Sequence, residues 1–252
     1  MTTTSQIEGD LQIQLELARQ VQLRLLPDRR CCLSDWEVAF SYESAGFVSG
    51  DYVDLIPAGP DAFYFALGDV SGKGVAASML MSHLHATLRA LLLSQRSIEE
   101  IVTIASQTFC QSALPAQFAT LVLGKADRDG GLELVNAGHN QVLLLDGTEV
   151  EVIAAASLPL GMFCSTEFTT QKRRVKPGSM LFLYSDGITE STDEAGIEFD
   201  MNRLVEKLRE SEGLPPSAIV HTIQGTLARY TKGEPLNDDR TMLALRWAGT
   251  GV

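Results

Sequence analysis

Two short turns in the middle of the chain restrict its fold more than any other feature of the sequence. The segments QFATLVLGKAD and LELVNAGH are separated only by RDGG, and QVLLLDGTEVEVI carries Asp146-Gly147 between two apolar runs. An Asp-Gly pair between alternating apolar and polar residues is typical of a tight β-hairpin. Because such turns join antiparallel neighbours, they exclude a purely parallel sheet.

Periodic segments on both sides of this meander predict further strands and helices. Strands are expected at 36–44, 61–70, 179–186 and 240–247, and helices at 11–26, 75–93, around 202–211 and around 216–230. The pattern predicts an α+β fold in which antiparallel sheets are covered by helices, with no internal repeat.

Composition limits the classes of function. The chain has 252 residues, of which 45% are hydrophobic, so it is long enough to bury a large core. Its formal net charge of −12 argues against a nucleic-acid or anionic-membrane partner. The sequence has neither a signal peptide pattern nor an apolar run near twenty residues, so a cytoplasmic location is expected. The four cysteines show no metal-ligand spacing and are expected to be free or buried thiols: Cys31, Cys32, Cys110 and Cys164.

The N-terminal segment is expected to be separate from the main domain. Residues 1–30 are predicted to form a helical segment for linkage or dimerisation, and residues 31–252 the folded domain. Apolar side chains in this segment fall on more than one helix face: Leu11, Ile13, Leu15, Leu17, Ala18, Val21, Leu23 and Leu25. A helix with this pattern is expected to pack on the domain and also to contact a second copy of the chain.

The stretch ALGDVSGKGVAASML indicates either a phosphate-binding loop or a metal-binding turn. A P-loop needs four residues between its first glycine and the Gly-Lys pair, followed by Ser or Thr. Here Gly68 and Gly72 enclose only three residues, and Gly74 follows Lys73. The spacing therefore disfavours a nucleotide-binding switch protein and leaves Asp69, at the end of an apolar strand, as the residue of interest.

Aspartates stand at four separate strand ends in this sequence. They are Asp51 and Asp54 in VSGDYVD, Asp69, Asp186 in LFLYSDGITE, and Asp238 and Asp239 in LNDDRTMLAL. Convergence of these carboxylates would suit a hard cation such as magnesium or manganese. His83 and His85 lie on different faces of their predicted helix and are poor candidates for a shared metal site.

The ordered set SGDYVD, GDVSGKG, NAGHN, LPLGM, LYSDGITE and DDRT resembles the SpoIIE/RsbU branch of the PPM, or type 2C, metal-dependent serine/threonine protein phosphatases. The resemblance runs from ARQVQLRLLP to MLALRW. It implies two stacked antiparallel sheets flanked by helices, with a phosphatase domain at 31–252. By position, it implies metal ligation by Asp51, Asp69, Asp186, Asp238 and the carbonyl of Val70. Asp54 and Asp239 match acidic positions of less certain role, and His139 matches a residue that is expected to be structural.

The resemblance also implies a reaction and a partner. Two Mn²⁺ or Mg²⁺ ions about 3.5–4 Å apart would activate water for attack on phosphoserine or phosphothreonine. The implied substrate is a phosphorylated STAS-domain anti-sigma-factor antagonist in a partner-switching pathway. No arginine stands next to Asp51 to hold the phosphate, while Lys73 would either orient substrate or lie solvated in its turn. The alternative is a pseudophosphatase that serves as an interaction module; the presence of all four aspartates disfavours it.

Overall fold

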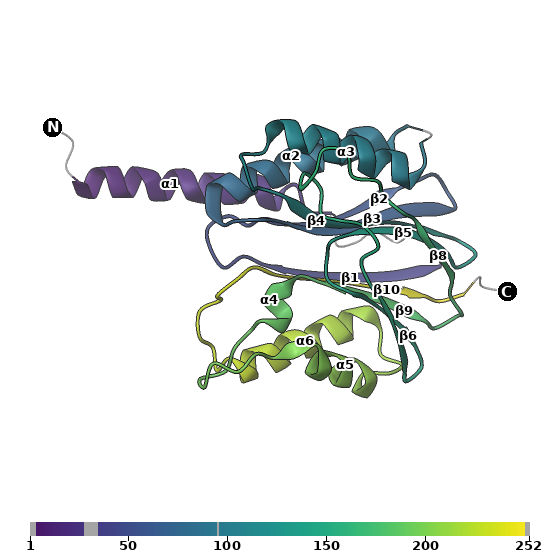
Figure 1. Cartoon of the computed structure of the whole chain (residues 1–252). Coiled ribbons are helices and arrows are strands. Elements are labelled where there is room, and N and C mark those ends of the chain that lie inside the picture. The colour runs from purple at the N-terminus through teal and green to yellow at the C-terminus, as the bar shows by residue number, and fades with distance from the viewer. Residues whose placement is uncertain (1–3, 28–34, 95, 250–252) are drawn as a thin grey trace.

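The computed structural model describes residues 4–27, 35–94 and 96–249 as two stacked antiparallel sheets between helical layers (Figure 1). One sheet has the order β1 (Trp36–Glu43), β10 (Arg240–Trp247), β9 (Met180–Tyr184), β6 (Val142–Asp146) and β7 (Glu149–Ile153). The other has the order β2 (Asp51–Pro57), β3 (Ala62–Val70), β4 (Ala119–Asp127), β5 (Gly131–Ala137) and β8 (Gln171–Arg174). The predicted α+β class and the stacked sheets are confirmed.

Six helices complete the described part of the chain. They are α1 (Thr4–Leu23), α2 (Gly74–Leu92), α3 (Ile98–Ser112), α4 (Asp186–Thr189), α5 (Asp200–Glu210) and α6 (Pro216–Tyr230). Helices α2 and α3 cover the β2–β8 sheet, while α4, α5 and α6 cover the other one (Figure 1). Both predicted hairpins form: β4 pairs with β5, and β6 pairs with β7 through a turn in which Gly147 has φ +62°.

The core consists of three apolar layers, because each sheet is covered on both faces. One layer lies between the two sheets, one under α2 and α3, and one under α4, α5 and α6. This explains why β9, with the sequence MLFLY, is apolar at every position and buried throughout. An antiparallel strand with one solvated face would instead alternate apolar and polar residues.

Helix α3 and strand β8 were not expected from the sequence. The start of α3 carries a capping box, in which the Ser97 hydroxyl accepts from the Glu100 amide while the Glu100 carboxylate accepts from the Ser97 amide. Its buried residues follow a helical spacing: Ile98, Ile101, Val102, Ala105 and Phe109. Both signals were present in the sequence and predict this helix. Strand β8, four residues long with the sequence QKRR, has no apolar pattern that would reveal it.

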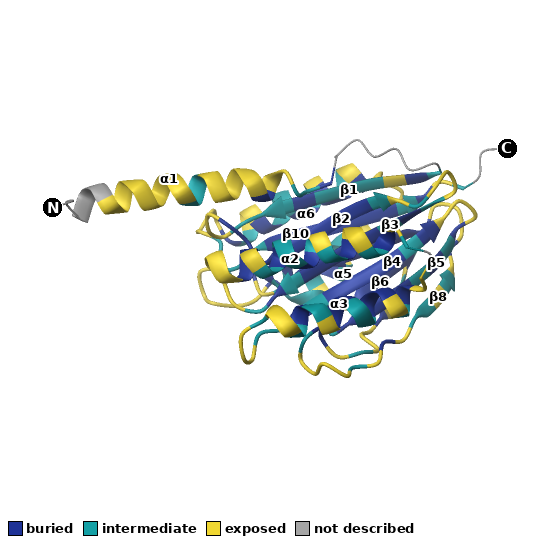
Figure 2. Cartoon of the chain, turned by 90° about the horizontal axis from the view of Figure 1, so that it is seen from above, coloured by how far each residue is buried: buried dark blue, intermediate teal, exposed yellow. Residues whose placement is uncertain are grey.

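Helix α1 extends away from the body of the protein, and most of its surface is exposed (Figure 2). Six large apolar side chains on it are 44–61% exposed: Ile7, Leu11, Ile13, Leu17, Val21 and Leu23. Packing of this segment on the domain is therefore confirmed only at its C-terminal end, where Gln22 is buried and Leu25 and Leu26 contact the core. The division at residue 30 and the contact with a second copy stay predictions.

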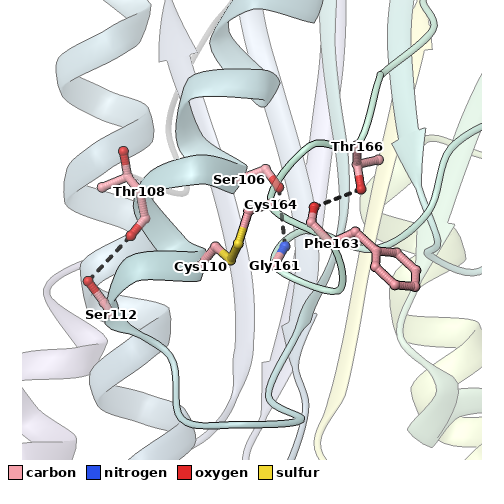
Figure 3. Close-up of a disulfide and its surroundings, with 8 residues drawn as sticks. All are labelled: Ser106, Thr108, Cys110, Ser112, Gly161, Phe163, Cys164 and Thr166. Atoms are coloured by element: carbon pink, nitrogen blue, oxygen red, sulfur yellow. Dashed lines mark hydrogen bonds between the residues drawn. A yellow bond between two sulfur atoms is a disulfide. The ribbon is translucent and has the colours of Figure 1, made fainter.

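The expectation of four free thiols is wrong for two of the cysteines. Cys110, in the last turn of α3, forms a disulfide with Cys164, and their Cα atoms lie 5.8 Å apart (Figure 3). The two residues are 54 positions apart in sequence, so only the tertiary fold brings them together. Cys31 and Cys32 lie outside the described residues. Across the described ranges, no helix is long and apolar enough to span a membrane.

Candidate active site

The four aspartates predicted as metal ligands stand at strand ends on two different sheets. In one sheet, Asp51 begins β2 and lies directly opposite Asp69, near the end of β3. In the other, Asp186 begins α4 two residues after β9, and Asp238 lies two residues before β10. The neighbouring carboxylates of Asp186 and Asp238 both act on the pKa of Asp69. The stacking of the sheets thus brings the four side chains into one electrostatic cluster, which we call the carboxylate cluster.

A missing side chain at Gly50 leaves space for the predicted backbone ligand. A Cβ atom at this position would lie 2.9 Å from the Val70 carbonyl oxygen and 3.1 Å from Oδ1 of Asp69. Both oxygens therefore border the same small volume, which any larger residue would fill. The Val70 carbonyl and the Asp69 carboxylate thus lie close together, while their ligation of a metal ion stays a prediction.

Close backbone packing also fixes Asp186. A Cβ atom on Gly187 would lie only 2.1 Å from the Asp239 carbonyl oxygen, so the turn after β9 rests directly on the backbone before β10. The Ser185 hydroxyl accepts from the Thr241 amide at 2.9 Å, and the Thr241 hydroxyl donates to Oδ2 of Asp51. This chain of hydrogen bonds connects the positions of Asp186 and Asp51.

Burial and mutual repulsion raise the pKa values of Asp51, Asp69 and Asp186 in the carboxylate cluster. The pKa of Asp69 rises from 3.8 to about 7, because of burial first and then the charges of Asp186 and Asp238. Burial, followed by the charge of Asp69, raises the pKa of Asp51 well above its ordinary value. The pKa of Asp186 is also raised, by burial and by Asp238. Ionisation of this cluster therefore requires a compensating cation.

Lys73 supplies one such cation from the protein itself. Its Nζ lies 2.8 Å from Oδ2 of Asp238 and donates to the Asn237 carbonyl at 2.8 Å. Among the residues that the structure describes, no three His, Cys, Asp or Glu side chains are arranged to hold a metal ion. Asp238 is paired with Lys73, and Asp51 accepts a hydrogen bond from Thr241. The donor set still fits a hard cation, since it consists of carboxylate and carbonyl oxygens.

Asp239 adds its charge to that of the carboxylate cluster, but its own carboxylate organises the loop before β2. Its carboxylate accepts hydrogen bonds from the Ala45 amide at 2.8 Å, the Ser49 hydroxyl at 2.6 Å and the Gly50 amide at 3.0 Å. The sequence did not indicate a second residue with a similar role. The Gln22 side chain, at the end of α1, donates to the Ser49 carbonyl at 2.8 Å and accepts from the Ser49 amide at 2.9 Å. These contacts position the segment that leads to Asp51.

Asp54 serves a different purpose from the other acidic residues. It is fully buried and receives two hydrogen bonds from Arg89 of α2, at 2.8 and 2.7 Å. The Tyr52 hydroxyl donates to the same carboxylate at 3.1 Å, and His85 Nε2 lies 3.8 Å away. Asp54 lies three positions after Asp51 along β2, so their side chains project from opposite faces of the strand. Asp54 is a structural ion-pair residue under α2.

His139 and the LPLGM motif build the neighbouring end of the sheet. His139 is buried, its Nδ1 lies 2.8 Å from the Thr120 hydroxyl, and its amide donates to Asn136 Oδ1 at 2.9 Å. Burial lowers the pKa of its imidazole to about 4. Gly138 has φ +66°, and a Cβ atom on it would lie 2.3 Å from Pro159. NAGHN and LPLGM are therefore linked by packing, in agreement with the structural role expected for His139.

Comparison with known proteins places this geometry in a family. Residues 59–248 match the family model described as stage II sporulation protein E (SpoIIE). Protein IcfG of Synechocystis sp. is 28% identical over 94% of this chain and 42% of its own length. Phosphoserine phosphatase RsbU of Bacillus subtilis is 24% identical over 95% of this chain and 72% of its own. This chain thus spans less than half of IcfG.

The solved SiaA-PP2C domain of Pseudomonas aeruginosa superposes on this fold with a TM-score of 0.85. The two are 22% identical, and the match covers 95% of this chain and 98% of that one. This likeness shows that the two chains share the PP2C fold. Together with the family match over 59–248, it leads to one conclusion: the chain belongs to the SpoIIE family and has the fold of PP2C (PPM) phosphatase domains.

Proposed function

We propose that this protein is a metal-dependent phosphatase that hydrolyses phosphoserine or phosphothreonine on a regulatory protein. The observation that carries the proposal is the convergence of the carboxylate cluster with the Val70 carbonyl beside Gly50. The relative RsbU is named a phosphoserine phosphatase, which supports the same reaction here.

The residues of the carboxylate cluster and the neighbouring glycines have different roles in the proposed reaction. Asp51, Asp69, Asp186 and Asp238 would hold two Mn²⁺ or Mg²⁺ ions, with the Val70 carbonyl as a further ligand. When bound, the ions would lower the pKa of a water molecule and neutralise the phosphoryl oxygens. Gly50 and Gly187 keep the backbone close enough for these ligands to meet.

Lys73 is the residue that we expect to contact the phosphoryl group. In this structure its ammonium is paired with Asp238. With Asp238 engaged as a metal ligand, the Lys73 ammonium would be free to pair with the phosphoryl oxygens beside the cluster. Lys73 thus takes the place of the phosphate-holding arginine that is not found next to Asp51.

The substrate follows from the family context. We propose a phosphorylated STAS-domain anti-sigma-factor antagonist, whose dephosphorylation would act in partner switching; RsbU and other SpoIIE-family relatives support this context. The exposed apolar side chains of α1 support self-association of the N-terminal segment 1–30, or its contact with an upstream regulator. The competing proposal is a pseudophosphatase that binds the same partner without hydrolysis.

Release of phosphate from an aryl phosphate, measured with and without Mn²⁺, separates these two functions. The parent should show Mn²⁺-dependent turnover, and Asp69→Asn should abolish it. Asp129→Asn is the matched control, because Asp129 is an exposed turn residue at the opposite end of β4 from the carboxylate cluster. Asp54→Asn is unsuitable as a control, since it would remove the charge from a buried ion pair with Arg89. Absence of Mn²⁺-dependent turnover in the parent would favour the pseudophosphatase.

A further inference from the structure

A pocket of about 500 Å³ opens directly beside the carboxylate cluster. It lies between the segment that begins with α4 and the segment that connects α6 to β10, which Figure 1 shows at the same end of the sandwich. Gly187 and Asp238 line it, so the pocket shares a wall with the cluster, and Lys73 forms part of the same wall. A ligand in this pocket would therefore adjoin any phosphoryl group held at the cluster.

Arg240 lines this pocket, and its charge has no partner among the residues that the structure describes. The residue is only 7% exposed, yet across the described ranges its guanidinium forms neither a hydrogen bond nor an ion pair. Glu43 lies opposite Arg240 in the β1–β10 pair, but the two side chains are too far apart for an ion pair. The Glu43 carboxylate instead accepts a hydrogen bond from Gln224 at 2.6 Å. Because the guanidinium nitrogens are not fully enclosed, they are open to a ligand in the pocket. A cation that has lost most of its solvent and has no counter-charge in contact favours a ligand that supplies one.

The pocket lining combines buried donor groups with several acidic residues. Thr231 is buried, and no partner for its hydroxyl is found in the part of the chain that the structure describes. A hydroxyl and a guanidinium in one pocket provide the hydrogen-bond donors that a carboxylate accepts. Glu190 and Glu234 are exposed, so solvent and salt screen their charges, and the Asp193 carboxylate accepts from the amides of Ala195 and Ile197. Arg240 and Thr231 thus favour an anion although the pocket as a whole is acidic.

We propose that this pocket is a specificity subsite, in which Arg240 binds an acidic side chain of the substrate protein near the phosphorylated residue. The proposal deepens the phosphatase function and rests on it, because the shared wall at Asp238 and Gly187 sets the spacing between the two anions. The carboxylate cluster takes the phosphoryl group, while Arg240 takes a carboxylate of the same polypeptide segment. This arrangement selects a sequence context rather than the phosphate alone.

Two sets of phosphoserine peptides test the subsite. In the first set, each peptide carries a single Glu at one position within three residues of the phosphoserine. The second set carries the isosteric Gln at the same positions. The parent should prefer Glu over Gln at one or more positions by about tenfold in kcat/KM, since hydrogen bonds to charged groups are stronger than neutral ones. Arg240→Met should bring this ratio close to one, and Arg240→Lys should keep part of it. The ratio compares two peptides on one variant, so a change in its basal activity cancels.

Arg229→Met is the control, because Arg229 is an exposed cation on α6 outside the pocket and its loss changes the net charge equally. It should keep the parental ratio and the parental turnover of an aryl phosphate.

A parent that prefers Glu at no position, or an Arg240→Met variant that keeps the preference, overturns the subsite. If Arg240→Met alters only inhibition by inorganic phosphate, the pocket binds the product and the proposal is wrong. Without any aryl phosphate turnover the phosphatase function itself fails, and peptide binding measured by fluorescence anisotropy then tests the subsite alone.

Discussion

Replacing Asp69 with asparagine should stabilise the metal-free protein while it removes the activity. The pKa of Asp69 rises from 3.8 to about 7 in the fold, a difference of roughly 3.2 units. At about 1.36 kcal/mol per unit, ionised Asp69 costs the folded state about 4 kcal/mol at a pH well above 7. Asparagine keeps the shape and removes this charge. Because 1 kcal/mol shifts the melting temperature of a chain of this size by about 2–4 °C, the gain is roughly 8–16 °C as an upper limit.

The direction of the pH dependence follows from proton binding. The folded state holds the Asp69 proton up to about pH 7, whereas the unfolded state releases it near 3.8. Between these values Asp69 binds more protons in the folded state, so its contribution to the stability of the parent falls as pH rises through this range and then levels off. Asp69→Asn has no carboxyl group at this position and therefore does not lose this stability as pH rises. The stability difference between the two proteins should therefore be largest at pH 8 and small near pH 4.

Thermal or urea unfolding in the presence of a chelator measures this difference, and the same scans with Mn²⁺ measure the metal effect. Mn²⁺ at a concentration of about a hundred times its dissociation constant would raise the free energy of unfolding of the parent by about 2.7 kcal/mol. The increase for Asp69→Asn should be clearly smaller. Asp129→Asn should follow the parent in both conditions. If the advantage of Asp69→Asn is missing at pH 8, or is the same at pH 4 and pH 8, the repulsion argument is wrong. Equal stabilisation of both proteins by Mn²⁺ would refute ligation by Asp69.

Three further predictions concern other parts of the molecule. Lys73→Met should bind Mn²⁺ more tightly than the parent in calorimetry, by no more than about fivefold, because the exposed pair with Asp238 is worth only about 0–1 kcal/mol. Lys73→Arg is the control, and an unchanged affinity of Lys73→Met would contradict competition between Lys73 and the metal ion for Asp238. The contribution of His139 to the free energy of unfolding should fall by up to about 3 kcal/mol between pH 6.5 and pH 4, because the buried imidazole resists the proton that the unfolded state takes up, and this is opposite in sign to the Asp69 contribution. In urea titrations the stability of the parent relative to His139→Asn should therefore decrease over this range, and an unchanged difference would argue against it. Light scattering should find a dimer that dissociates when residues 1–20 are removed, a cut that keeps Gln22; a monomer at high concentration in both forms would exclude the contact.

The local order of the chain was readable from the sequence, since it depends on neighbouring residues. The Asp146-Gly147 turn and the RDGG turn required antiparallel pairs, and those pairs form. Apolar runs that end in aspartates placed Asp51, Asp69, Asp186 and Asp238 at strand ends, and the structure has them there. Helix α3 could have been found in the same way, because its capping box and helical spacing are local signals.

The tertiary structure alone decided which of the acidic residues share a site. Asp238 and Asp239 are adjacent in sequence, yet one faces Lys73 and the other holds the loop before β2. Asp54 pairs with Arg89, 35 residues away, because a strand alternates its faces and α2 packs on the far one. The same holds for the Cys110–Cys164 disulfide and for the position of Arg240 in the pocket beside the carboxylate cluster. These assignments depend on which segments the stacking of two sheets brings together, and no local pattern along the chain encodes such contacts.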